Sequence, residues 1–357
     1  MCATSVRAIG VCAINAFATI VFATSTLATS TLATGAFATS AFATSALAQS
    51  NPWHERTRVL AIQPGVTATI VAPEKLDLKK QVDLILYALP NGNSTAETMG
   101  RAPFDSVLWR YDIQHIAAQT RALRDRGYPQ AIVIYLEAEG KSWPSWRAKL
   151  TYPVANPRIV EIVNELRTAV GNPPKMSVIL TGHSGGGSFM FGFIDGQDAL
   201  PEWLDRIAFL DANYNFEPKH GDKLLAWLNA NSRRRLEVLA YDDREIMLDG
   251  KKVVSDSGGT WRATERMVRR LSESVTFTHD TLGAFERYRS KQIELLRHPN
   301  RENRILHTEM IGEMNGYMHV MLAGRPGYSD AVSVLKPVRQ YTKYVDQLTP
   351  PPGPPHN

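Results

Sequence analysis

Short apolar runs bounded by polar and turn-forming residues recur along the chain from about residue 57 onward. Runs of this length with flanking Gly, Pro, Asn or Asp are typical of buried strands. The first two runs, separated by the turn Pro64-Gly65, predict short N-terminal strands. The strands predicted in this way cover residues 59–62, 67–71, 82–88, 131–136, 178–180, 206–210, 236–241 and 305–311.

Between these runs, apolar residues recur every three or four positions, which is the period of an amphipathic helix. One such segment opens at Pro157, and the first helical position tolerates proline. The predicted helices cover residues 111–126, 157–170, 189–194, 223–229, 263–271 and 282–296. Strands that alternate with helices indicate an α/β fold, with a mostly parallel central sheet and helices on both faces.

Polar residues follow several of the predicted strands at their carboxyl ends, where open α/β sheets bind ligands. They include residues 91–93, Ser184, Asp211 and the pair Asp242-Asp243. We therefore expect the functional site at this edge of the sheet.

The first 48 residues differ from the rest of the chain. They contain one charge (Arg7), both cysteines and a five-residue repeat rich in Ala, Thr and Ser. The small-x-small pattern Ala46-Leu47-Ala48 precedes the first polar run, so we predict a signal peptide cleaved after Ala48 and a secreted or periplasmic protein. The frequent Thr and Ser disfavour an uncleaved membrane anchor, so no stable membrane insertion is expected after cleavage. One domain is expected over residues 49–347, followed by a Pro-rich tail over 348–357.

Composition narrows the function classes. The formal charge of +5 is small and dispersed, which argues against a nucleic-acid partner. The expected mature chain has no cysteine, which excludes disulfides and thiol chemistry. No grouping of His, Asp and Glu has the spacing of metal ligands, and we expect neither a metal nor another cofactor.

The segment Gly182-His183-Ser184-Gly185-Gly186 follows a predicted strand and precedes a predicted helix. This is a G-x-S-x-G match in the strand–turn–helix context that the motif requires. Glycines on both sides allow a sharp turn that exposes the serine hydroxyl. Ser184 is therefore the candidate nucleophile.

On this elbow, and on the order of its later acids and histidines, the chain resembles the α/β-hydrolase superfamily over roughly residues 57–345. The superfamily has the chain order Ser, acid, His. The resemblance implies Asp243 as the acid, because it follows the small residue Ala240 by three positions. Asp242 and Asp211 stay open as alternatives.

The resemblance places the histidine in a loop after a late strand. His319 follows the turn Asn315-Gly316 after the predicted last strand, and it is the expected base. His279 is the alternative. His307 lies inside the predicted strand 305–311 and is expected to pack against the sheet, while His298 is expected on a surface loop.

The resemblance also implies an oxyanion hole of two backbone N–H groups. One is that of Gly185, and the other comes from the loop after the third strand, where Asn91 is expected and Gly92 is next. Trp143 and Trp146 follow the fourth strand and are predicted to line a substrate pocket. Trp261 and Tyr214 are further aromatic candidates on neighbouring loops.

These features predict a serine hydrolase that acts through a Ser-His-Asp triad and an acyl-enzyme. Its partner would be a small-molecule or polysaccharide-linked carboxylic ester. Two other readings remain: a serine peptidase, and a non-catalytic protein that binds carbohydrate or another ligand on the same scaffold.

Overall fold

The computed structural model describes residues 52–103 and 106–347. The predicted signal peptide and Pro-rich tail lie outside the described residues. Within them, ten strands form one sheet in the order β1-β2-β4-β3-β5-β6-β7-β12-β11-β10. The strands are β1 (Glu55–Gln63), β2 (Val66–Pro73), β3 (Val82–Ala88), β4 (Ala131–Ala138), β5 (Met176–His183), β6 (Leu204–Leu210), β7 (Arg235–Tyr241), β10 (Thr278–Leu282), β11 (Phe285–Arg289) and β12 (Ile293–His298); β8 (Met247–Leu248) and β9 (Lys251–Lys252) form a separate hairpin.

Helices connect most of the strands. They are α1 (Thr95–Met99), α2 (Ile116–Arg124), α3 (Trp143–Leu150), α4 (Tyr152–Ala169), α5 (Gly187–Asp195), α6 (Pro218–Ala230), α7 (Thr260–Ser272) and α8 (Gly316–Leu322). Short 3₁₀ turns are η1 (Ser106–Asp112), η2 (Glu139–Lys141), η3 (Ser184–Gly186), η4 (Asp330–Val332) and η5 (Thr342–Tyr344). No helix in the described ranges is long and apolar enough to cross a membrane.

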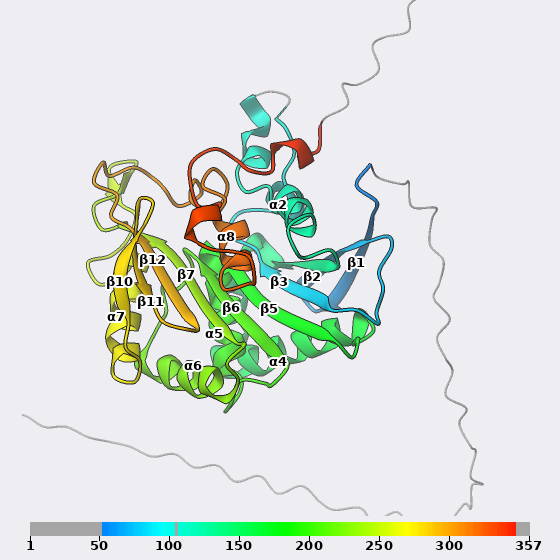
Figure 1. Cartoon of the computed structure of the whole chain (residues 1–357), viewed down its shortest axis with the longest axis horizontal. Helices are drawn as coiled ribbons and strands as arrows, with labels where there is room; N and C mark the ends of the chain where they lie inside the picture. Colours follow the sequence, from blue (N-terminus) through cyan, green and yellow to red (C-terminus); the bar gives the residue numbers. More distant parts are fainter. Residues whose placement is uncertain (1–51, 104–105, 348–357) are drawn as a thin grey trace, which may run out of the picture. The chain divides into compact units, whose positions relative to one another are not determined.

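The sheet is mostly parallel and is covered on both faces. β4, β3, β5, β6, β7 and β12 run parallel, whereas β2 and the hairpin β10–β11 pair antiparallel at the two sides. Alternate strand residues face opposite ways. Leu180 therefore packs in one core with Phe189 of α5, while Ile179 packs in the other with Tyr317 of α8. Figure 1 shows α2 and α8 on one side of the sheet and α4, α5 and α6 on the other. The predicted α/β class and two-sided architecture are confirmed.

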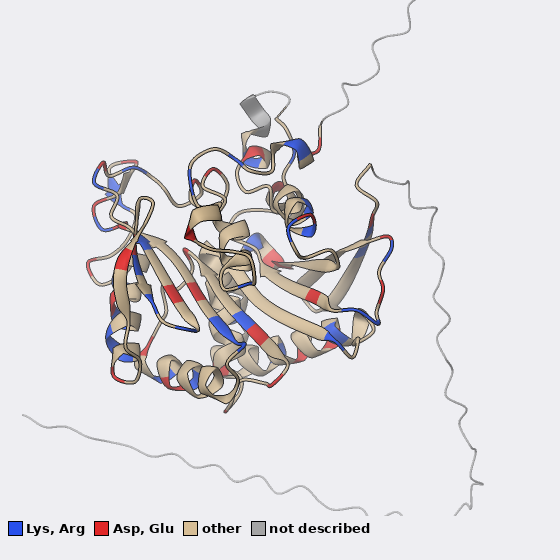
Figure 2. Ribbon diagram, in the orientation of Figure 1, with Lys and Arg blue, Asp and Glu red and all other residues tan. Residues whose placement is uncertain are grey.

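Charged residues occur on strands of the sheet as well as on helices and loops (Figure 2). Glu237 of β7 accepts a hydrogen bond from Arg206 on the adjacent strand β6 at 3.2 Å, and another from Arg235 on its own strand at 2.7 Å. These groups are nearly or largely buried, and buried charges are tolerated when they are paired in this way. They mark the amino ends of β6 and β7, away from the carboxyl ends where the candidate site lies.

Two predicted elements in the C-terminal half are wrong, and one predicted helix begins earlier than expected. The predicted helix 282–296 is replaced by β11 and β12, because Gly283 (φ 58°) closes a two-residue turn that pairs Leu282 with Phe285. The predicted strand 305–311 is a loop of turns, in which Leu306, Met310 and Ile311 are buried against the α2–α8 face. Pro157 lies inside α4, which begins at Tyr152 with another proline in its first turn.

The turn between β5 and α5 depends on close backbone packing. A Cβ atom on Gly187 would overlap the backbone carbonyl oxygen of Ala212, and one on Gly186 would overlap that of Ala88. Because neither backbone can move without displacing a strand end, only glycine fits at these positions. Gly187 follows the five-residue motif directly, so the glycine requirement extends one residue beyond the G-x-S-x-G pattern. With the serine after the fifth strand of this sheet, the fold is α/β-hydrolase-like.

Replacement of Gly187 by alanine is expected to lower the free energy of unfolding by about 3 kcal/mol, the upper range for overpacking. Urea denaturation followed by circular dichroism measures this loss. Gly185→Ala is the matched control, since its Cβ would meet only the exposed side chain of Asn91, which can move. Equal losses at the two positions would contradict the packing argument.

Candidate active site

Ser184 lies directly after the carboxyl end of β5 in a left-handed backbone conformation, with φ at 52°. Non-glycine residues rarely adopt this conformation, and it persists only where the surrounding structure imposes it. Here the close approach of Gly186 and Gly187 to neighbouring backbone holds the turn. The structure therefore gives the predicted nucleophile the strained elbow that the motif implies.

A histidine–carboxylate pair lies beside the elbow, but it is not the predicted one. Nδ1 of His307 lies 2.5 Å from Oδ2 of Asp211, which directly follows β6. Asp211 is fully buried and its other oxygen accepts a bond from the hydroxyl of Thr260. An Nδ1–H donated to a carboxylate leaves Nε2 of the same ring as the basic atom. This pair can therefore act as an oriented general base.

His183, the residue before the serine, holds His307 in place. Its Nε2 donates to the backbone oxygen of His307 at 3.0 Å, and the two ring centroids are 4.4 Å apart. Burial, followed by the neighbouring His307, keeps the pKa of His183 well below its usual value, so the ring is neutral. His183 occupies the variable position of the G-x-S-x-G motif, so these contacts connect the residue before Ser184 with the loop that carries His307.

Asp243, the acid predicted from the resemblance, does not contact the histidine. Its Oδ2 accepts the backbone N–H of Thr260 at 2.8 Å, at the start of α7. The prediction of Asp243 as the histidine's partner is therefore not met, and the alternative Asp211 takes that position. Asp242 forms an ion pair with Arg244 at 2.7 Å. This agrees with the expectation that adjacent residues leave a strand in opposite directions.

Thr260 couples the two carboxylates, because its hydroxyl bonds Asp211 and its N–H bonds Asp243. Burial and then the proximity of Asp211 raise the pKa of Asp243 to about 6. The unfolded chain has an aspartate pKa near 4. Between these pH values Asp243 holds more protons in the folded protein than in the unfolded chain. The free energy of unfolding therefore falls as pH rises through this range.

We therefore expect Asp243→Asn to stabilise the protein more at pH 8 than at pH 4, by at most about 3 kcal/mol for a shift of this size. Asparagine keeps an acceptor for Thr260 but cannot become charged. Unfolding in urea at a series of pH values measures the difference. Asp242→Asn, which removes a carboxylate paired with Arg244, should give no such gain at high pH. A pH-independent effect of Asp243→Asn would contradict the assignment.

His319, the predicted base, lies at the opposite edge of the sheet. Its Nε2 is 2.9 Å from Glu294, the second residue of β12, and its Nδ1 is 2.9 Å from the hydroxyl of Tyr328. β12 runs parallel to β7, and β7 runs parallel to β6 and β5, so Glu294 near the start of β12 lies at the amino ends of these strands, whereas Ser184 follows a carboxyl end. His319 and Ser184 are not brought together, so the prediction of His319 as the base is wrong for this structure.

The alternative histidine, His279, also lies away from the serine. It is on β10, two strands beyond β12, and stacks on Tyr288 with ring centroids 4.4 Å apart. His298 ends β12 and accepts the N–H of Asn300 at 3.0 Å.

The loop after β3 reaches the elbow as expected. The side chain of Asn91 packs so closely on Gly185 that a Cβ there would overlap it. The N–H of Gly92 already donates to the carbonyl of Lys141 at 2.9 Å, which removes Gly92 from the candidate oxyanion donors. Asn91 and Gly185 are thus adjacent, and their N–H groups remain the candidates.

The predicted pocket tryptophans are core residues instead. Trp143 and Trp146 are 1% and 3% exposed and pack edge to face, with ring centroids 5.5 Å apart. Their indole N–H groups donate to the carbonyls of Leu136 and Pro64. Trp261 is likewise buried, with Arg297 stacked 3.9 Å from its ring. The sequence shows aromatic residues after a strand but not which way they face.

Tyr214 is the aromatic residue at the site. Its hydroxyl interacts with the side chain of Ser184, and burial followed by the charges of Asp211 and Asp243 raises its pKa well above the usual value. It therefore stays protonated. Ser184 makes no hydrogen bond with His307 in the described structure, and such bonds between nucleophile and base often tighten only when substrate binds.

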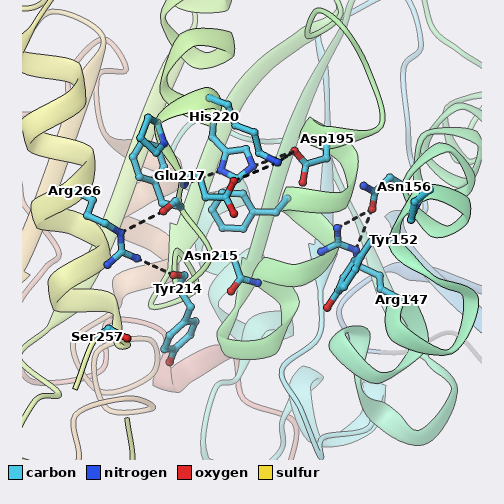
Figure 3. Close-up of a pocket in the computed structure, with 15 residues that line it drawn as sticks. Arg147, Tyr152, Asn156, Asp195, Tyr214, Asn215, Glu217, His220, Ser257 and Arg266 are labelled. Atoms are coloured by element: carbon cyan, nitrogen blue, oxygen red, sulfur yellow. Dashed lines mark hydrogen bonds and ion pairs between the residues drawn. The ribbon is translucent and has the colours of Figure 1, made fainter. Parts of the chain in front are cut away.

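Tyr214 is one of the residues that line a cleft of about 880 Å³ (Figure 3), and its hydroxyl connects this cleft with Ser184. The cleft is bounded by the loop after β6, by α3 and α4, and by α7. Its aromatic lining comes from Tyr152, Phe191 and Phe216 as well as Tyr214. No cluster of three or more His, Cys, Asp or Glu side chains fit to hold a metal occurs in the ranges that the structure describes.

Comparison with known proteins gives structural likeness only. No family model and no curated protein sequence matches the chain. An acetyl xylan esterase from Aspergillus awamori aligns over 69% of this chain and 93% of its own, with 11% identity and a TM-score of 0.42. An esterase from the planctomycete Thermogutta terrifontis aligns over 79% and 100%, with 8% identity and a TM-score of 0.39. The feruloyl esterase module from Clostridium thermocellum aligns over 64% and 76%, with 9% identity and a TM-score of 0.38.

Proposed function

We propose that the protein is a serine hydrolase of carboxylic esters, with Ser184 as nucleophile, His307 as general base and Asp211 as the acid that orients it. The observation that carries the proposal is the His307–Asp211 pair at 2.5 Å beside a serine held in a left-handed elbow. The chain order serine, acid, histidine is the order of the superfamily that the sequence resembles.

In this mechanism, Nε2 of His307 accepts the proton of Ser184 as Oγ attacks the ester carbonyl. Asp211 holds Nδ1–H of the ring and stabilises the imidazolium that forms, which needs no metal. The ring then donates the proton to the leaving alkoxide, and an acyl-enzyme remains. Water, activated by the same ring, attacks the acyl carbon and releases the acid.

The oxyanion of each tetrahedral intermediate would be bound by the N–H groups of Gly185 and Asn91. Both lie at the elbow, and the competing donor on Gly92 is occupied. Preorganised backbone donors of this kind commonly lower the barrier by about 3–4 kcal/mol. Tyr214 keeps its proton at neutral pH and supplies a further polar contact to the resting serine.

Fluorophosphonate labelling of the chain from Gln49 onward, mapped by mass spectrometry, tests the proposal. We expect the label on Ser184, and its loss in Ser184→Ala and His307→Ala. His279→Ala, which changes an imidazole outside the site, should keep the label. A folded protein that takes no label would favour the non-catalytic binding protein instead.

We also propose that the protein is exported, with cleavage after Ala48. N-terminal sequencing of the mature protein from culture medium or periplasm should begin at Gln49. A mature protein that retains residue 1 would overturn this proposal.

A further inference from the structure

Two arginine side chains in the cleft beside Tyr214 have no carboxylate partner. Arg147 and Arg266 form no ion pair in the described part of the chain, although both line the same cleft. In Figure 3 they enter it from opposite sides, with Asn215 between them. Because a desolvated guanidinium without a counter-charge is costly, such groups are suited to bind an anion.

Arg147 is 3% exposed and is held rigidly. Its Nε and Nη2 donate to Oδ1 of Asn156 at 3.2 and 2.7 Å, and its Nη1 donates to the carbonyl and hydroxyl of Ser188 at 2.8 and 3.1 Å. One N–H of Nη2 is left for a ligand. Ser188 lies on α5, four residues after the nucleophile. All of these acceptors are neutral, and the half-exposed ring of Tyr152 lies 4.6 Å from the guanidinium carbon. Burial lowers the pKa of Arg147, and Tyr152 and the charge of Asp195 offset this effect only in part.

Arg266 lies on α7 at the other wall and is partly exposed. It donates to the backbone carbonyls of Tyr214 at 3.1 Å and Phe216 at 3.3 Å. A guanidinium has five N–H donors in a planar fork, so the remaining N–H groups of Arg266 are available to a ligand. The same side chain fixes the loop whose tyrosine meets Ser184.

The other charged groups of the cleft pair among themselves. Asp195 accepts a bond from Nε2 of His220 at 3.1 Å and pairs with Lys219 at 3.3 Å. Burial alone would raise the pKa of Asp195, but His220 and Lys219 lower it to about 2. Lys219 also pairs with Glu217 at 3.3 Å. Lys219 thus meets two carboxylates, and with the two arginines the cleft keeps an excess of one positive charge. The two arginines are the charged groups of its lining that form no ion pair with another described residue.

We propose that the cleft binds a carboxylate group carried by the ester substrate, between Arg147 and Arg266, with the scissile ester on the Ser184 side of Tyr214. A carboxylate can accept two parallel bonds from one guanidinium, which the free N–H groups of Arg266 allow, and a single bond from the remaining N–H of Arg147. The aromatic lining would hold the carbon skeleton between the carboxylate and the ester. This inference rests on the proposed ester hydrolysis at Ser184 for the nature of the ligand.

Turnover of a matched pair of esters tests the charge preference. 4-Acetoxybenzoate and 4-acetoxybenzamide have nearly the same shape and the same acetyl group, but only the first is an anion. We expect kcat/KM to be at least tenfold higher for the anion, and this ratio to fall to about one in Arg266→Gln and Arg147→Gln. Arg147 is buried, so the Arg147→Gln variant can unfold. In that case Arg266→Gln alone tests the charge preference, because Arg266 is partly exposed.

Arg167→Gln is the matched control. Arg167 also has no carboxylate partner and stacks 4.0 Å from Trp203, but it does not line the cleft. Its loss should leave the ratio as in the wild type. A ratio near one in the wild type, or the same fall in Arg167→Gln as in Arg266→Gln, would overturn the inference.

Binding to Ser184→Ala separates this inference from the proposed function. By calorimetry, the variant should bind 4-acetoxybenzoate at least tenfold more tightly than 4-acetoxybenzamide, and Arg266→Gln in the same background should abolish the difference. Equal affinities overturn the anion site whatever the turnover. A wild type that binds the anion tightly but hydrolyses neither ester overturns the esterase function and leaves the site in place.

Discussion

Replacement of His307 by alanine is expected to lower kcat for p-nitrophenyl acetate by about four to six orders of magnitude, the range seen when a triad loses its base. The ring takes part in proton transfer and not in ground-state binding, so KM should change little. Steady-state kinetics on purified protein, with circular dichroism to verify folding, measures both constants.

His319→Gln is the control that separates the structure from the sequence-based expectation. Glutamine can still donate a hydrogen bond to Glu294, the buried partner of His319 at the amino edge of the sheet. We expect kcat within about tenfold of the wild type, because no reacting atom lies there. If His319→Gln loses activity and His307→Ala keeps it, the assignment from the structure is wrong.

The alternation of apolar runs was sufficient to predict the central part of the sheet. Residues such as Val178, Leu180 and Ile207 lie in strands buried on both faces, and such strands read as continuous apolar runs. The prediction failed where burial has another cause. Leu306 and Met310 are buried as parts of a loop under α8, and their spacing imitates a strand.

The helix predicted over 282–296 failed for a related reason. Leu282, Phe285 and Leu296 recur at intervals that fit a helix, but they lie on three different strands, β10, β11 and β12. Arg287 on β11 is buried and forms ion pairs with Asp280 and Asp330. A charged residue in the sequence therefore does not mark an exposed position here. The signal that could have corrected the prediction is Gly283, which permits a tight hairpin turn.

The candidate site was predicted in part. The local motif predicted the elbow at Ser184, since an elbow is formed by consecutive residues, while the roles of Ser184 and Gly185 stay predictions. His307 could not be put forward as a candidate base once residues 305–311 were predicted to form a strand, because a strand residue there is expected to pack against the sheet. The choice between Asp211 and Asp243 depends on which strand end the loop of His307 reaches, and this is a property of the tertiary structure.

Asp211→Asn is expected to lower kcat by about 10⁴-fold, because an amide can hold the histidine ring in the wrong tautomer. Asparagine tolerates the left-handed conformation that Asp211 adopts (φ 47°), so folding should be preserved. Asp243→Asn, one strand further, should keep kcat within about tenfold at pH 8, since Asp243 contacts Thr260 and not His307. Parallel kinetics on the two variants decides between the carboxylates. A large loss in Asp243→Asn with a small one in Asp211→Asn would mean that His307 changes partner when substrate binds.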